Sequence, residues 1–310
     1  MDPLSDILSG LRIRAASFTR MDASAPWGVR SSGESAIKFV LLLRGSAILT
    51  TPAQPQPLAL RSGDVFIMLD DTPYRLYDHE DSTLIDCVEV EKQRVGNYIE
   101  IGGGGTLTTF ISGAFQLDAL QAQPLLRALP ALLCLQLDQH RSLAFQSVLE
   151  MLALETEAPA LGSTAVISRL FELLLVHAIR HYSQQPGGPS QGWLAAMADR
   201  HLAHALQAMH DAPAQGWTVE SLARTAGMSR SSFAARFRQV VGQSPLDYLT
   251  QWRMYCASRL LQQGKLALAE VARQVGYESP AAFNRVFRRE TATTPGAFRK
   301  RADTAQALTA

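Results

Sequence analysis

The sequence predicts a multidomain β + α protein, with a β-rich N-terminal part, a helical connector and an all-α C-terminal part. Short β-rich runs separated by turn residues occupy residues 33–116, and apolar residues recur at helical spacing over residues 117–182. From Trp193 onward the spacing is helical throughout. The segment "SQQPGGPSQG" has no periodicity and is typical of a linker. We therefore expect domains at 1–116, 117–182 and 193–302, with the linker at 183–192.

The N-terminal domain is predicted to be an antiparallel sandwich or a small barrel. Its runs include "AIKFVLLL", "GSAILTT" and "GDVFIML", which are short and rich in residues that favour strands. Glycine, proline and aspartate punctuate them, as expected for tight turns between antiparallel strands.

The connector is predicted to contain two helices, at 143–155 and 163–182. They carry more apolar surface than one small barrel should cover, and "LFELLLVHAI" is nearly apolar all round. We expect this surface to make the protein a homodimer, with simple packing on the barrel as the alternative.

An internal repeat is the most specific feature of the C-terminal part. "SLARTAGMSRSSFAARFRQVVGQSP" (221–245) resembles "EVARQVGYESPAAFNRVFRRETATTP" (270–295), and Gly227 recurs as Gly276 after 49 residues. Each copy predicts a helix, a glycine-containing turn and a second helix, which is a helix-turn-helix. Glycine suits such a turn because it tolerates a positive φ.

Two phenylalanines one turn apart anchor the second helix of each copy, Phe233 with Phe237 and Phe283 with Phe287. Because residues i and i+4 share a helix face, the opposite face is left to small and polar side chains. Asparagine and arginine match the donors and acceptors of base edges, and flanking arginines suit phosphates. The predicted DNA-contacting residues are Arg230, Ser231, Ala234, Ala235, Arg238, Ala281, Asn284, Arg285, Arg288 and Arg289.

The two copies are predicted to be joined rigidly. "LDYLTQWRMYCASRLLQQ" lies between them and has one apolar stripe at helical spacing, so we expect one long helix. Motifs held about 34 Å apart would meet successive major-groove turns on one face of DNA. Thr218 and Ser229 are predicted N-caps of the first copy, whereas Ala267 cannot cap the first helix of the second.

The charge distribution supports a polyanionic partner for the C-terminal part alone. Residues 191–310 hold 15 lysines and arginines against 8 aspartates and glutamates, a net charge of +7. The rest of the chain carries −6, so the overall net charge of +1 conceals the asymmetry. A basic segment on an acidic body indicates a polyanionic partner for that segment, and together with the two helix-turn-helix copies it favours double-stranded DNA.

Residues 195–300 strongly resemble the DNA-binding domain of the AraC/XylS family. The matching stretches are "TVESLARTAGMSRSSFAARFRQVVGQSPLDYLTQWRM" and "AEVARQVGYESPAAFNRVFRRETATTPGAFR". The resemblance implies two helix-turn-helix units in adjacent major grooves and a transcription regulator, commonly an activator. It also implies RNA polymerase as a partner.

Residues 1–190 resemble the cupin-type sensor half found in one branch of that family. The cues are "DPLSDIL", "APWG", "GSAILT", "RSGDVFIML", "GGGG" and "PLLRALP". Enzymatic cupins hold a metal with histidine and glutamate, but here Val40 and Arg44 stand where that branch tends to have these ligands. Tyr74 replaces another histidine, and His79 is the only histidine before His140.

One histidine cannot build a two- or three-histidine site. We therefore expect no metal, no cofactor and no enzymatic activity, and interpret the domain as the sensor of a small-molecule effector. The candidate effector-binding residues are Trp27, Phe39, Phe66 and Tyr74. The alternative is a cupin-type metalloenzyme fused to a DNA-binding domain.

The remaining composition favours a cytoplasmic protein. The cysteines Cys87, Cys134 and Cys256 are odd in number and widely spaced, which fits a reducing compartment. No apolar run reaches the roughly 18 residues of a membrane helix, and "MDPLSDILSG" lacks the features of a signal peptide.

Overall fold

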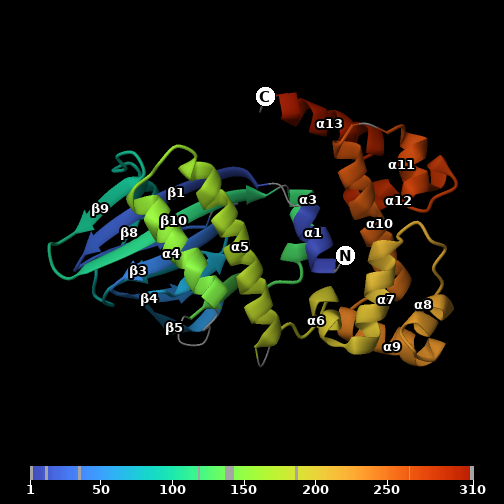
Figure 1. The fold of residues 1–310 in the computed structure, drawn as a ribbon, viewed down its shortest axis with the longest axis horizontal. Coiled ribbons are helices and arrows are strands. Elements are labelled where there is room, and N and C mark those ends of the chain that lie inside the picture. The colour runs from blue at the N-terminus through green and yellow to red at the C-terminus, as the bar shows by residue number, and fades with distance from the viewer. Residues whose placement is uncertain are drawn as a thin grey trace. The chain divides into compact units, whose positions relative to one another are not determined.

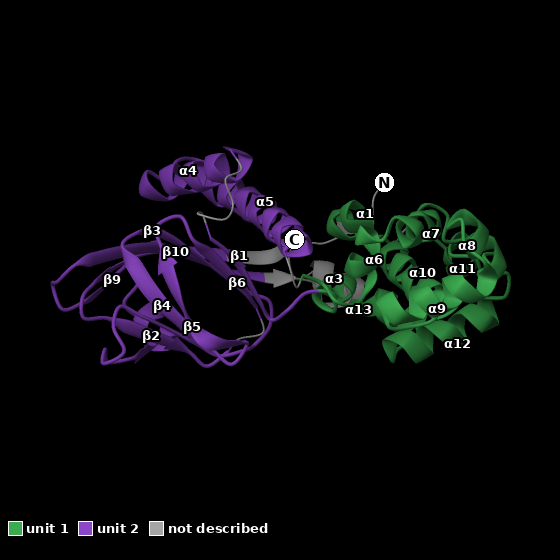
Figure 2. Ribbon diagram, turned by 90° about the horizontal axis from the view of Figure 1, so that it is seen from below, with its two compact units in different colours: residues 1–12, 118–128, 187–310 green, residues 13–117, 129–186 purple. Residues whose placement is uncertain are grey.

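The computed structural model describes residues 3–10, 13–33, 36–117, 119–136, 143–185, 188–264 and 266–307. The chain divides into two compact units, which Figure 2 shows in different colours. Residues 13–117 and 129–186, purple in Figure 2, form the unit named here the β unit. Residues 1–12, 118–128 and 187–310, green in Figure 2, form the unit named here the helical unit. Residues 186 and 187 of the expected linker lie outside the described residues.

The β unit contains two sheets around one apolar core. One sheet has the strand order β11-β6-β3-β10-β1-β9, and the other has the order β5-β4-β7-β2-β8. The strands are β1 (Ile13–Ser24), β2 (Gly28–Ser31), β3 (Ile37–Arg44), β4 (Ser46–Thr51), β5 (Gln54–Arg61), β6 (Val65–Met68), β7 (Tyr74–Tyr77), β8 (Ile85–Asp86), β9 (Tyr98–Gly102), β10 (Leu107–Leu117) and β11 (Leu132–Leu135).

The predicted small barrel is therefore a pair of facing sheets, since the ladders among the described strands do not run round a closed ring. The edge strands β8 and β11 are only two and four residues long, so they offer few backbone groups for a ladder that would join the sheets. The interval 117–182, expected to be helical, also contributes β11, which pairs antiparallel with β6.

Three helices complete the β unit: α2 (Cys87–Glu91), α4 (Leu143–Glu157) and α5 (Ser163–Gln184). Helix α5 packs on the six-stranded sheet (Figure 1). The ring centroid of Phe171 lies 4.6 Å from that of Phe39 and 4.7 Å from that of Phe115. A Cβ atom on Gly113 would lie 2.8 Å from the Phe171 ring, so the absence of a side chain there permits this close approach.

The helical unit is built from short helices around the long helix α10. Its elements are α1 (Pro3–Gly10), α3 (Ala119–Leu126), α6 (Trp193–Ala198), α7 (Arg200–Asp211), α8 (Val219–Thr225), α9 (Arg230–Val241), α10 (Pro245–Gln262), α11 (Leu268–Gln274), α12 (Pro280–Thr291) and α13 (Pro295–Ala307). None of the described helices combines the length and the apolar character that crossing a membrane requires.

Two segments assigned by sequence to the N-terminal domain and the connector pack in the helical unit instead. Ile7 of α1 is fully buried, and its carbonyl oxygen accepts a hydrogen bond of 3.2 Å from the Tyr255 hydroxyl. The carbonyl oxygen of Pro124 in α3 accepts one of 2.8 Å from Nε1 of Trp193. Helices this short are marginal alone, so α1 and α3 depend on packing against longer elements.

Candidate nucleic-acid interface

The first helix-turn-helix consists of α8 and α9, and both of its predicted N-caps are confirmed. The Thr218 hydroxyl accepts a hydrogen bond of 3.1 Å from the Ser221 amide, while the Ser221 hydroxyl accepts one of 2.9 Å from the Thr218 amide. Ser229 caps α9 through a hydrogen bond of 3.2 Å from the amide of Ser232. Gly227 has φ +66° in the turn, the conformation that its identity predicted.

Buried rings fix the rotation of α9. Phe233 and Phe237 are fully buried with their ring centroids 5.6 Å apart. On the opposite face Ala234 is half-buried, and the other predicted contact residues are exposed: Arg230, Ser231, Ala235 and Arg238. Neither Arg230 nor Arg238 has an ion pair or a side-chain hydrogen bond among the described residues. Their charge is therefore available to a polyanion.

The second helix-turn-helix consists of α11 and α12. Phe283 and Phe287 are buried with ring centroids 5.6 Å apart, and Phe287 also packs edge-on against Phe298 of α13. Ser279 caps α12, but no side chain caps α11, as the alanine at position 267 predicted.

The outer face of α12 forms a strongly basic hollow. Asn284, Arg285, Arg288 and Arg289 line a shallow depression with Leu268, Thr294 and Gly296. Asn284, Arg285 and Arg288 have no side-chain partner among the described residues. Arg289 differs, since its guanidinium lies 2.7 Å from the carboxylate of Glu290. Ala281 is exposed on the same helix, as predicted. Two unpaired arginines and an asparagine thus share one exposed surface.

The β unit contains a cavity of about 400 Å³ between its sheets. Of the four candidate effector residues, Tyr74 and Phe39 border it. Trp27 and Phe66 are buried in the surrounding core, where Trp27 packs on Phe110 with ring centroids 5.1 Å apart. The ring of Phe39 contacts Phe171, on the helix-covered side of its sheet. Sequence reasoning did not identify the polar and charged residues that line this cavity: Ser17, Thr19, Lys38, Glu91, Lys92 and Ser112.

The positions where a metal-binding cupin would carry ligands hold other chemistry. Val40 is buried in the apolar core, Arg44 is exposed, and the ring of Tyr74 packs edge-on against Phe66. His79 is exposed beside Asp81. Within the described ranges, no three histidine, cysteine, aspartate or glutamate side chains lie together in a way that would hold a metal ion.

Paired recognition helices with exposed basic faces, in a chain that also has a cupin-like β unit, define a DNA-binding transcription regulator. Residues 2–184 match the cupin family, and residues 222–301 match a helix-turn-helix domain family. A putative AraC-like transcription regulator of Streptomyces lividans is 33% identical over 97% of this chain and 98% of its own length. The chain belongs to the family of AraC-like transcription regulators.

Two further comparisons cover different extents of the chain. The RCS-specific HTH-type transcriptional activator RclR of Escherichia coli (strain K12) is 29% identical over 86% of this chain and 85% of its own length. The crystal structure of the DNA-binding domain of AdpA in complex with a target DNA is 33% identical, with a TM-score of 0.33. The match covers 34% of this chain and 95% of the AdpA chain.

Proposed function

We propose that α9 and α12 each enter a major groove and that α12 supplies the principal base-reading side chains. The observation that carries this proposal is the unpaired, exposed pair Asn284 and Arg285, held over the buried Phe283 and Phe287, with the unpaired Arg288 beside them for a phosphate. An arginine can donate two hydrogen bonds to guanine, and an asparagine can pair with adenine. On α9, Arg230 and Arg238 serve mainly as phosphate contacts because the predicted contact residues between them, Ser231, Ala234 and Ala235, are small.

We further propose that the β unit binds a small-molecule effector in its cavity. The volume of about 400 Å³ lies in the range of known ligand sites. The lining holds Lys38, Lys92 and Glu91 beside the ring of Tyr74, and Lys92 is paired with Glu89 at 2.7 Å, so a polar, hydrogen-bonding effector fits better than an alkane. In this role the sensor needs neither metal nor catalysis.

The protein acts, in this proposal, as a cytoplasmic homodimeric activator that contacts RNA polymerase. The activator role follows the function named for the relative RclR. The cytoplasmic location follows from chromosomal DNA as the partner. The dimer is supported by apolar side chains that α4 and α5 leave exposed, namely Leu143, Met151, Leu154, Val166 and Leu173.

Binding of the full-length chain to genomic fragments tests the DNA proposal. Fragments selected by the protein should share a sequence, and affinity for them should fall steeply with salt because basic side chains displace counterions. Random duplexes of the same length serve as controls. A full-length protein that is folded by circular dichroism yet selects no shared sequence would contradict base reading by α12.

A further inference from the structure

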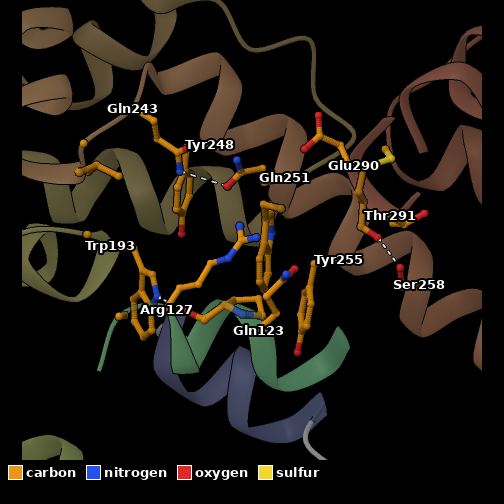
Figure 3. Close-up of a pocket in the computed structure, with 17 residues that line it drawn as sticks. Gln123, Arg127, Trp193, Gln243, Tyr248, Gln251, Tyr255, Ser258, Glu290 and Thr291 are labelled. Carbon is orange, nitrogen blue, oxygen red and sulfur yellow. Dashed lines mark hydrogen bonds between the residues drawn. The ribbon is translucent and has the colours of Figure 1, made fainter. Parts of the chain in front are cut away.

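The helical unit contains a cavity of about 360 Å³ that is separate from the exposed faces of α9 and α12. Its walls come from α3, the start of α6, the length of α10 and the last turns of α9 and α12 (Figure 3). Val241 at the end of α9 and Thr291 at the end of α12 both line it. A molecule in this cavity would touch both helix-turn-helix motifs and α3 at once.

Aromatic side chains of α10 give the cavity a rigid wall. The ring of Trp252 stacks on that of His210 at 3.7 Å and on that of Tyr255 at 4.9 Å. The hydroxyl of Tyr248 shares a hydrogen bond of 2.8 Å with His210, which holds that ring as well. Fixed rings of this kind bind flat apolar groups with little loss of side-chain entropy.

The wall also contains an unused hydrogen-bond donor. Trp252 is only 5% exposed, and its Nε1 atom has no hydrogen-bond partner among the described residues. Leaving a buried N–H group unpaired costs free energy, but this atom is shielded from the cavity, so Trp252 serves a ligand through the face of its ring.

Arg127 is the cation of this cavity. Figure 3 shows its side chain extending from the end of α3 toward Tyr248 and Gln251. Its guanidinium has no ion pair or hydrogen bond among the described residues. The other charged residue of the lining, Glu290, is already paired with Arg289 at 2.7 Å. The cavity therefore presents one unpaired positive charge.

Amide groups add directional hydrogen bonds near this charge. Gln243 donates to Gln251 at 3.2 Å, so each holds the other in place. The Gln251 amide nitrogen and the whole amide of Gln123 have no partner among the described residues. An arginine fork with neighbouring amide donors matches the two oxygens of a carboxylate.

We propose that this cavity binds a small aromatic carboxylate. The ring of the ligand lies against Trp252 and Tyr255, and its carboxylate accepts hydrogen bonds from Arg127. Because Arg127 follows α3 and the rings belong to α10, the ligand links α3 to the helix that spaces the two motifs. Bound ligand thereby changes the affinity for operator DNA through a site distinct from the β-unit cavity.

Calorimetric titration of the full-length protein with naphthalene-2-carboxylate tests the proposal, and naphthalene-2-carboxamide is the matched neutral probe. The wild type should bind the carboxylate, and Arg127→Gln should bind it at least tenfold more weakly because a charged hydrogen-bonded pair is lost. Binding of the carboxamide should be little changed by Arg127→Gln. Arg127 is exposed, so the variant should fold, and Arg169→Ala on α5 is the control for loss of a surface arginine.

Three results would overturn the proposal. The first is no binding of the carboxylate by the wild type at millimolar concentration. The second is binding that Arg127→Gln leaves unchanged while Lys38→Ala abolishes it, which would place the ligand in the β unit. The third is binding that depends on Arg127 but leaves operator affinity unaltered, which would refute the link to DNA. Operator binding without ligand is measured in parallel, so failure of DNA binding is recognised separately.

Discussion

The Nε2 atom of His210 lies 2.8 Å from the hydroxyl oxygen of Tyr248, and both side chains are buried between α7 and α10. Burial lowers the pKa of His210 to about 3, although the charge of Asp211 opposes this shift. The imidazole is therefore neutral at neutral pH, and the 3.7 Å between its Nδ1 and the Asp6 carboxylate is not an ion pair. Burial likewise raises the pKa of Tyr248, so the contact joins two neutral groups.

The stability of the helical unit should fall as the pH drops below the unfolded pKa of His210. The folded pKa of about 3 lies below the ordinary 6.5, so the unfolded chain takes up the proton first. Each pH unit from 6.5 toward 3 should cost up to about 1.4 kcal/mol of unfolding free energy. Urea unfolding followed by tryptophan fluorescence measures this slope.

The contribution of His210 is isolated by comparing variants. In His210→Phe the unfolding free energy should depend less on pH than in the wild type, because no group then titrates at this position. Tyr248→Phe removes the hydroxyl but leaves the imidazole buried, so it should retain the slope. Equal pH dependence in wild type and His210→Phe would show that the acid sensitivity comes from carboxylates elsewhere.

On α12, we expect Arg285 to read bases and Arg288 to contact a phosphate. Arg285→Ala should weaken binding to the true operator by about 1–3 kcal/mol and flatten the preference over mutated sites. Arg288→Ala should weaken all duplexes nearly equally and lower the salt slope by about one. Affinities for matched and scrambled duplexes over a range of salt distinguish the two.

Arg289 provides the internal comparison for that experiment. The sequence places Arg289 toward the side of the helix, which predicts a phosphate contact. Its guanidinium must first release the Glu290 carboxylate, which lies 2.7 Å away. Arg289→Ala should therefore lower the salt slope by less than Arg288→Ala does. If Arg285→Ala leaves sequence preference unchanged, specificity arises from α9 or from DNA shape instead.

A serine at position 267 should stabilise the second motif. Ala267 is exposed and has φ −64° and ψ 152°, the backbone conformation of an N-cap, but supplies no side-chain acceptor. Glu270 stands three residues later, so Ala267→Ser completes a capping box. The gain should be about 1 kcal/mol in urea unfolding. Ser279→Ala, which removes the existing cap of α12, should lower the free energy of unfolding by a similar amount. An unchanged free energy of unfolding in both variants would mean that N-caps at these two positions do not contribute to stability.

The two motifs were predictable because their signals are local. The spacing of Phe233 and Phe237, the capping Ser229 and the turn glycine at 227 lie within a few residues of one another. Their geometry follows from helix periodicity and the conformational freedom of glycine. The same locality made the absence of a cap at Ala267 visible in the sequence.

Long-range packing explains what sequence reasoning missed. Ile7 is fully buried and its carbonyl oxygen accepts a hydrogen bond from Tyr255, 248 residues away, and no local pattern signals this. On β3 both pleat faces are buried, so alternation does not show which face adjoins the inter-sheet core. For this reason the sequence could not show that Phe39 contacts α5 while Lys38 lines the cavity.

Charge on the exposed apolar face of α4 should dissociate the proposed homodimer. Leu154 is 67% exposed, and Leu143 and Met151 precede it by eleven and three residues, so the three side chains form one stripe at helical spacing. Phe171 of α5 packs on the sheet, whereas these three side chains of α4 are exposed among the described residues. Burying a leucine contributes about 1.5–3 kcal/mol, so Leu154→Glu should weaken self-association tenfold or more. Sedimentation equilibrium of the full-length protein measures the change.

Val95→Glu is the matched control, because Val95 is 78% exposed but lies outside α4 and α5. A wild-type protein that is monomeric at micromolar concentration would show that the stripe is simply solvated, and a dimer that survives Leu154→Glu would place the interface on another surface.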